Sequence, residues 1–348
     1  MTNLINIGRA EVTQTLSKTP GTPYTELSQA DEELFRPVLN KWRPANEPPV
    51  ILLRWFMTEW CNYKCPYCSQ THDRDAPKGR GLTAHAFDNF PIERWLASFE
   101  RHFADKRLSL VITGGEPFVD RHSMLPLLQF LTSRPGAECI RIDTNAWWHP
   151  DTYVGLDKSR ITLMCTFHPS QVSAERFFAK VDALLEAGFQ IGMVNYVMTA
   201  DNLEHYVEFR EALGRKNVPL HPNPLWDAAG KYSEEALELL RSELPVTDFL
   251  YRTGIRAPRG KHCLFPGLAY EMDYIGEIHV GCHRDASGSF FDQTLPDLFA
   301  GPAPCPHTSC VCLDKYSFLA ESNRNTGWDP LRIYGEVLRG VRGIHPSS

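Results

Sequence analysis

The 348-residue chain is predicted to be an α/β protein: a partial (βα)6 barrel followed by a small cysteine-rich domain. From Val50 to about residue 243, short apolar runs rich in β-branched and aromatic residues alternate with segments of helical period. This alternation is typical of βαβ units that build a parallel sheet. Beyond residue 243 the alternation ends, and five of the ten cysteines follow between 263 and 312. Such a stretch favours a small module organised by metal ligands.

Six apolar runs are predicted to be strands, and five amphipathic segments are predicted to be helices. Six strands are too few for a closed eight-stranded barrel, so an open or partial barrel is expected. The expected strands are Val50–Phe56, Leu108–Thr113, Cys139–Asp143, Ile161–Thr166, Gln190–Met198 and Val218–His221. The expected helices are Ile92–Phe103, Ser123–Thr132, Ser173–Ala187, Leu203–Leu213 and Glu234–Leu240.

Changes in composition divide the chain into four parts. Residues 1–49 are polar and contain several prolines, which predicts an irregular lead-in. The barrel is expected over 50–243 and the cysteine-rich domain over 244–320, and residues 321–348 are expected to form a tail.

Charge and hydropathy exclude several classes of protein. The formal net charge is −6, and no long run of Lys or Arg indicates a nucleic-acid partner. No apolar run approaches the length of a membrane span, and the first residues do not resemble a signal peptide. A cytoplasmic location is therefore expected, where clustered cysteines serve metals more often than disulfides.

Polar residues gather where the predicted strands end. In parallel α/β folds the ligand site lies at the carboxyl ends of the strands, so these residues are candidates for one site. They are Trp60-Cys61, Thr113-Gly114-Gly115-Glu116-Pro117, Asp143-Thr144-Asn145, Thr166-Phe167-His168, Asn195-Tyr196 and His221-Pro222-Asn223.

Three cysteines follow the first predicted strand with the spacing C-x3-C-x2-C: Cys61, Cys65 and Cys68. Three thiolates on one loop can bind three irons of a four-iron cubane and leave the fourth iron open. An open coordination position is typical of a catalytic site. The alternative is a zinc site in which His72 supplies the fourth ligand.

The three-cysteine spacing, together with the Gly114–Pro117 segment after the second strand, resembles the radical S-adenosylmethionine (SAM) superfamily over residues 50–225. The resemblance implies a [4Fe-4S] cluster on the three cysteines, with the amino and carboxylate groups of SAM on the open iron. Reductive cleavage would then release a 5'-deoxyadenosyl radical. Gly114, Gly115, Glu116 and Pro117 are expected to hold the amino group of SAM, because glycines allow close backbone approach and Glu116 or a backbone carbonyl can accept from an ammonium. Further residues expected to contact the cofactor are Tyr67, Thr144 and Asn195.

The second group of cysteines frames a predicted β-hairpin that turns near Gly276. This arrangement resembles the auxiliary-cluster domain of SPASM/twitch radical SAM enzymes and implies a second [4Fe-4S] cluster. Five cysteines favour the shorter twitch form, although the C-x4-C-x-C ending departs from its usual spacing. The alternative is a structural zinc site. The implied ligands are Cys263, Cys282, Cys305 and either Cys310 or Cys312.

Three residues are candidates for catalysis. His168 and Asn145 follow strands at the expected site, although each could instead be an ordinary loop or turn residue. Cys165 is a candidate hydrogen-atom donor, with a buried core residue as the alternative. Weaker candidates for ligand contact or pocket walls are His221, Trp147, Trp148 and Trp226, and Cys139 is expected to be buried.

These features together predict an enzyme that abstracts hydrogen from a substrate carbon. The favoured reaction is oxidation of a small polar metabolite, such as a sugar, aminocyclitol or nucleoside intermediate, with the second cluster receiving an electron. A flavodoxin or ferredoxin is the expected electron donor. The alternatives are a peptide maturase, a radical epimerase and a zinc-organised binding module.

Overall fold

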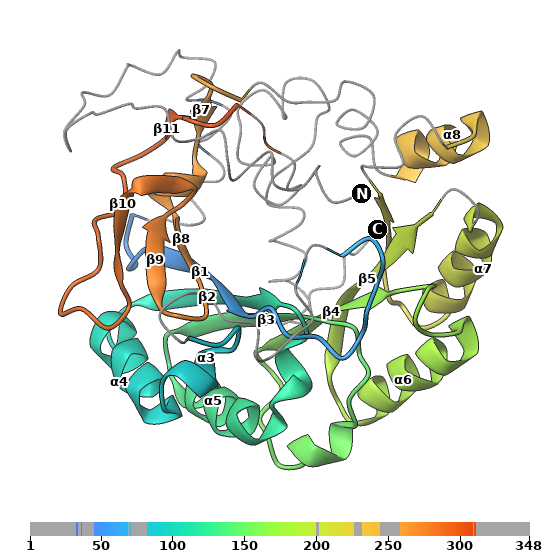
Figure 1. Ribbon diagram of the computed structural model, residues 1–348, viewed down its shortest axis with the longest axis horizontal. Coiled ribbons are helices and arrows are strands. Elements are labelled where there is room, and N and C mark those ends of the chain that lie inside the picture. The colour runs from blue at the N-terminus through green and yellow to red at the C-terminus, as the bar shows by residue number, and fades with distance from the viewer. Residues whose placement is uncertain are drawn as a thin grey trace.

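The computed structural model describes residues 33, 36, 45–68, 70, 82–199, 202–225, 232–243, 258–308 and 310 (Figure 1). The expected tail, most of the expected lead-in, and His72, Trp226 and Cys312 lie outside these residues. Among the helices described, none is long and apolar enough to cross a bilayer.

The six predicted strands form one continuous parallel array, which confirms the α/β fold class. Their order in the sheet follows their order in the chain, and the helices between them lie on the outer side of the curved sheet (Figure 1). The strands are β1 (Val50–Thr58), β2 (Arg107–Gly114), β3 (Ala137–Thr144), β4 (Ile161–Phe167), β5 (Gln190–Met198) and β6 (Leu220–Pro224). The main helices are α4 (Ile92–Phe103), α5 (Arg121–Ser133), α6 (Ala174–Glu186), α7 (Leu203–Gly214) and α8 (Glu234–Glu243), and α3 (Ala86–Asn89) is a single turn.

Side-chain caps set where two of the helices begin. Asp120 accepts hydrogen bonds from the backbone N–H groups of His122 and Ser123, so α5 starts two residues before the predicted Ser123. Ser173 accepts from the backbone N–H of Arg176 and is therefore the cap of α6. Each cap satisfies donors that the first helical turn would otherwise leave without partners.

The two faces of the sheet can be told apart from the core. On β4, Leu163, Cys165 and Phe167 belong to the main hydrophobic core, where Phe167 packs against Phe177 of α6. Met164 lies on the other face and forms a small separate cluster with Cys139 and Met193. Successive strand residues point to opposite faces. Leu163, Cys165 and Phe167 therefore face the helices, and Met164 faces the inner side of the sheet.

The C-terminal strands extend the same sheet. β8 (Ala269–Met272) pairs in parallel with β1, and β9 (Glu277–Val280) and β10 (His283–Ser289) continue beyond it. β8 and β9 form the predicted hairpin, which turns at Gly276 with a φ of 76°. A separate two-stranded sheet joins β7 (His262–Cys263) to β11 (Ala303–Pro304). The chain after residue 258 is therefore built onto the barrel sheet, and the domain boundaries stay a prediction.

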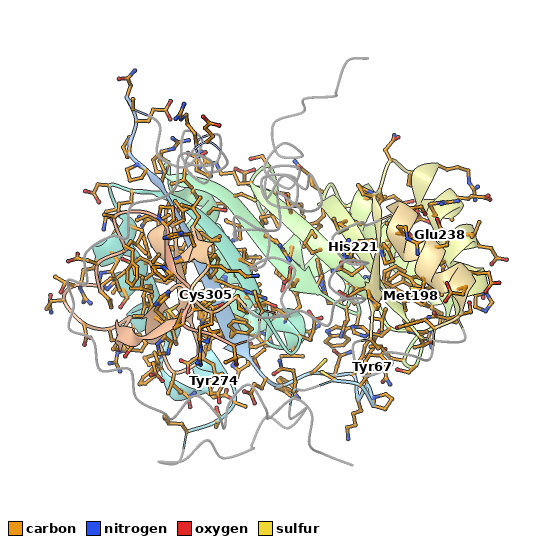
Figure 2. The ribbon with its side chains drawn as sticks, turned by 90° about the horizontal axis from the view of Figure 1, so that it is seen from above. Tyr67, Met198, His221, Glu238, Tyr274 and Cys305 are labelled. Atoms are coloured by element: carbon orange, nitrogen blue, oxygen red, sulfur yellow. The ribbon has the colours of Figure 1, made fainter. Side chains whose placement is uncertain are left out.

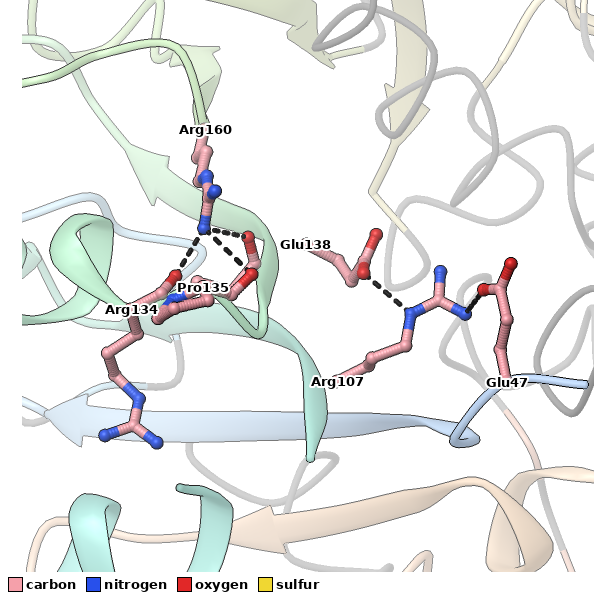
Figure 3. A network of polar contacts seen from close by, with 7 residues as sticks. Glu47, Arg107, Arg134, Pro135, Glu138 and Arg160 are labelled. Atoms are coloured by element: carbon pink, nitrogen blue, oxygen red, sulfur yellow. Dashed lines mark hydrogen bonds and ion pairs between the residues drawn. The ribbon is translucent and has the colours of Figure 1, made fainter. Parts of the chain in front are cut away.

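A polar network ties the strands together at their amino ends (Figure 3). The guanidinium of Arg107 on β2 contacts Glu138 at 2.7 Å and also pairs with Glu47. Nη1 of Arg160 donates to the backbone carbonyl of Ala137 at 3.0 Å, before β4 begins. Active sites of parallel barrels lie at the other edge, so this network is assigned to stability.

Phe290, just after β10, anchors the C-terminal strands on helix α4. Its side chain is fully buried, and its ring centroid lies 4.9 Å from that of Phe99 and 5.4 Å from that of His102. Nε2 of His102 donates to the carbonyl oxygen of Phe290 at 2.9 Å, and burial lowers the pKa of this histidine. The contact closes the sheet extension onto the helix layer.

Replacing Phe290 by alanine should therefore lower the free energy of unfolding by about 3–5 kcal/mol, because it removes an aromatic ring from a close-packed site. Chemical denaturation of Phe290→Ala beside Val154→Ala is the measurement. Val154 is 80% exposed, so its truncation should change little. Equal effects of the two substitutions would contradict the anchoring role.

Candidate functional site

The three-cysteine loop lies at the carboxyl end of β1. Cys61 is half-buried, Cys65 is buried and Cys68 is exposed, and none of them is in a disulfide. Burial raises the pKa of the Cys61 thiol to about 12, and repulsion from the nearby Cys68 and Cys65 acts in the same direction. The three thiols thus lie close enough to influence one another's charge, which suits a positively charged metal group.

These thiols fit the donor set of an iron–sulfur cluster. Among the residues that the structure describes, no group of three or more His, Cys, Asp and Glu side chains is arranged to hold one metal ion. In a four-iron cubane each thiolate binds a different iron, so the sulfurs need not converge on one point. The donor set of three free thiols on one loop therefore fits a cubane with one open iron.

The two glycines after β2 allow the chain to approach this loop closely. A Cβ atom on Gly114 would lie 2.0 Å from the carbonyl oxygen of Thr58, and one on Gly115 would lie 2.1 Å from that of Trp60. Gly114 also has a φ of 136°, which side chains rarely adopt. These glycines were expected to contact SAM. In the structure the space beside each Cα is filled by the backbone that leads into Cys61.

Glu116 is fully buried, and its carboxylate joins the ends of β2 and β3. It accepts hydrogen bonds from the backbone N–H of Asn145 at 2.6 Å and from the hydroxyl of Thr144 at 2.8 Å. It also accepts from the backbone N–H of Phe118 at 3.1 Å, in the short 3-10 helix that Pro117 begins. Burial raises the pKa of Glu116 to about 7 against the opposing effect of these hydrogen bonds. The carboxylate thus faces the protein.

Asn145 connects β3 to the cysteine loop. Its Nδ2 donates to Oδ1 of Asn62 at 2.9 Å and to Sγ of Cys61 at 3.7 Å. Thr144 holds the turn together, because its hydroxyl oxygen accepts from the indole N–H of Trp148 at 3.2 Å. Trp148 stacks on a core phenylalanine and is buried, whereas Trp147 is 41% exposed.

His168 contacts the same loop from the end of β4. Its Nδ1 lies 3.3 Å from the hydroxyl of Tyr67, and the two rings are stacked with an interplanar angle of 15°. Burial lowers the pKa of His168 to about 4, so the ring is neutral near pH 7. Three residues further on, the side-chain oxygen of Gln171 accepts from the backbone N–H of Lys64 at 3.1 Å. The cysteine loop is therefore held from β3 on one side and from β4 on the other.

The sequence did not single out the small polar residues that hold this loop. Asn62, Ser170 and Gln171 make contacts that bridge segments about 80 to 107 positions apart. Their side chains are ordinary for turns, so no local pattern separates them from other loop residues. The one available signal was their position beside candidate strand ends.

Three further candidates lie elsewhere on the sheet. Cys165 is fully buried in the core on the helix side of β4, where a hydrogen atom could not pass to a ligand on the inner face. This placement speaks against the expected role as a donor, and Cys139 is buried as expected. Asn195 pairs in register with Thr166 and His221, so these three residues form a row across β4, β5 and β6. His221 and Tyr67 lie on the same side of the molecule in Figure 2.

Four cysteines of the second group come together. Cys263 is buried, which raises the pKa of its thiol, and repulsion from Cys282, Cys310 and Cys305 adds to the rise. Strand β7 pairs with β11, and this pairing places Cys305 close to Cys263. The backbone N–H of Cys305 donates to the carbonyl oxygen of Lys261 at 2.9 Å. Cys310 thus lies near enough to Cys263 to influence its charge, and Cys312 lies outside the described residues, so the choice between Cys310 and Cys312 as a ligand stays open.

The two cysteine groups lie at opposite edges of the sheet. The first follows β1 and so lies at its carboxyl end. Cys263 precedes β8, which is parallel to β1, and Cys282 follows β9, which is antiparallel to β8. Both therefore lie at the amino edge of β1, and Figure 2 accordingly shows Cys305 and Tyr67 well apart.

Comparisons with known proteins agree with this architecture. No family model matches the chain. The GTP 3',8-cyclase of Vibrio atlanticus is 30% identical over 164 residues, which are 43% of this chain and 46% of that protein. The GTP 3',8-cyclase 1 of Pseudomonas aeruginosa is 27% identical over 192 residues, 51% of this chain and 55% of that protein. The chain thus spans about half the length of the curated relatives it matches.

A solved structure described as native anSMEcpe with bound AdoMet shares the fold. It superposes with a TM-score of 0.50 at 12% sequence identity, over 79% of this chain and 84% of that one.

The contact between Gly115 and Trp60 leads to a testable expectation. Gly115→Ala should displace the backbone before Cys61 and lose most of the iron bound at the first site, because the added Cβ would meet backbone atoms that cannot swing away. Gly214→Ala is the matched control, since a Cβ there meets nothing within 4 Å. Iron content after anaerobic reconstitution is the measurement. Full iron loading of Gly115→Ala would show that the close contact is not needed to shape the loop.

Proposed function

We propose that the chain is a radical SAM enzyme, which uses Cys61, Cys65 and Cys68 to bind a [4Fe-4S] cluster and cleaves SAM reductively. The observation that carries the proposal is the three-thiol loop at the carboxyl end of β1, held against the glycine pair and Asn145. When bound, the cluster supplies the electron that breaks a C–S bond of SAM and yields a 5'-deoxyadenosyl radical.

The residues around the loop are proposed to bind and orient SAM. Backbone carbonyls of the Gly114–Pro117 segment are placed to accept from its amino group, because the Glu116 carboxylate is already occupied by three donors. Tyr67 is proposed to line the site beside the cluster. Thr144 and Asn195 are proposed to contact the rest of the cofactor, and His168 and Asn145 are proposed to act close to the reacting atoms.

We further propose a second [4Fe-4S] cluster on Cys263, Cys282, Cys305 and Cys310. The mutual electrostatic influence of these four thiols supports this set, as does the pairing of β7 with β11. A structural zinc ion is the alternative occupant, and metal analysis separates the two.

The proposed reaction oxidises a small polar metabolite. The substrate would lose one hydrogen atom to form 5'-deoxyadenosine and one proton to solvent, and a cluster held by the second cysteine group would supply the acceptor for the remaining electron. A second candidate reaction is cyclisation of a nucleotide, which is favoured by the name of the relatives, GTP 3',8-cyclase. A flavodoxin- or ferredoxin-type donor in the cytoplasm is proposed to reduce the first cluster.

Anaerobically reconstituted protein should bind about eight irons per chain, as two four-iron clusters. Alanine at Cys61, Cys65 and Cys68 together should leave about four irons and abolish the formation of 5'-deoxyadenosine. Metal analysis and product chromatography are the measurements. A wild-type protein that never exceeds four irons and carries zinc instead would refute the second cluster, and full SAM cleavage by the triple variant would refute the first.

Cys165→Ala should leave turnover nearly unchanged, because the thiol lies in the helix-side core. Cys139→Ala is the matched comparison, since it removes a buried thiol from the other face. Product mass in deuterated water distinguishes the reactions. Dehydrogenation predicts a product that has lost two hydrogens in every variant, whereas a product that gains one deuterium only when Cys165 is present would establish an epimerase.

A further inference from the structure

Each thiol of the first cysteine loop receives at least one hydrogen-bond donor. Two donors belong to the loop itself: the backbone N–H of Tyr63 lies 3.4 Å from Sγ of Cys61, and that of Gln70 lies 3.4 Å from Sγ of Cys68. The remaining donors are side chains, and they are the ones that substitution can remove. They are Asn145 on Cys61 and the hydroxyl of Tyr67 on Cys65, and Ser170 donates to the Tyr67 hydroxyl oxygen.

The amide of Asn145 has its orientation set by its surroundings. Its Oδ1 accepts from the backbone N–H of Trp147 at 3.1 Å, and its own backbone N–H donates to Glu116. Because a backbone N–H can only donate, the oxygen must face Trp147 and Nδ2 must face Cys61. The donor is therefore preorganised on the sulfur, 3.7 Å away.

The hydroxyl of Tyr67 is oriented by His168. Nδ1 of His168 and Oγ of Ser170 each lie 3.3 Å from this hydroxyl oxygen. If Nδ1 carries the proton of the neutral imidazole, it donates to the Tyr67 oxygen and leaves the hydroxyl proton for the Cys65 sulfur. The stacked rings hold the two groups in this arrangement.

We propose that Tyr67 and Asn145 raise the reduction potential of the first cluster by donating hydrogen bonds to its ligand sulfurs, and that His168 is the positioning residue for Tyr67. The proposal rests on the proposed function. One electron enters the cluster from an external low-potential donor, and no bond breaks. The reduced state carries one more negative charge, so donors on the sulfurs stabilise it more than the oxidised state.

The test is a potentiometric titration of the full-length holoenzyme without substrate, with dithionite as reductant and the EPR signal of the reduced cluster as readout. Tyr67→Phe and Asn145→Leu should each lower the ratio of reduced to oxidised cluster about three- to tenfold at the wild-type midpoint. A tenfold change corresponds to about 59 mV for one electron. Tyr63→Phe is the matched control, because it removes a hydroxyl from the same loop that donates to none of the three sulfurs.

His168→Phe tests the positioning role, because it keeps an aromatic ring against Tyr67 without the Nδ1 donor. Its shift should have the sign of the Tyr67→Phe shift, and the double variant should match Tyr67→Phe alone. Variants with full iron content that titrate at the wild-type potential would overturn the proposal while leaving the proposed function intact. A wild-type protein without a four-iron EPR signal would overturn both.

Discussion

The carboxylate of Glu116 is the contact on which the rest of the site depends. It is buried, none of its partners among the described residues is a cation, and its three donors come from the chain that follows β2 and from the end of β3. Burial raises the pKa of Glu116 to about 7, so burial destabilises the ionised carboxylate by more than the three hydrogen bonds stabilise it. The buried carboxylate lies where β1, β2 and β3 meet. The backbone N–H of Glu116 also donates to the carbonyl oxygen of Trp60, one residue before Cys61.

The Glu116 carboxylate helps to position the cysteine loop through Asn145. Glu116 fixes the backbone of Asn145, and the Asn145 side chain reaches Asn62 and Cys61. The far side of the loop is held independently, by Gln171 on Lys64 and by His168 on Tyr67. Two anchors from different strands keep the thiols in place without relying on the length or composition of the loop itself.

The bounds of helices and strands that depend on local apolar periodicity could be predicted from the sequence. Helix Ile92–Phe103 and strand Gln190–Met198 have the predicted bounds, since apolar periodicity decides both. The face of Cys165 was not predictable, because buried parallel strands are apolar on both faces and carry no alternation to read. Nor was the pairing of β8 with β1, which joins Leu52 to Ala269 across more than two hundred positions and has no local signal. The same limit explains why Asn62 and Gln171 were missed.

Strands β8, β9 and β10, which extend the sheet beyond β1, fix the positions of the two cysteine groups relative to each other. β1 leads into the first group at its carboxyl end, and β8, its hydrogen-bonded neighbour, is preceded by Cys263 at the opposite edge. Phe290 fastens the extension to α4. In the proposed function, a substrate bound on the inner face of the sheet would lie between the cluster proposed to cleave SAM and the cluster proposed to accept an electron. An oxidation needs that order, whereas an epimerisation needs a thiol on the inner face; Cys165 lies on the helix side, and Cys139 lies on the inner face.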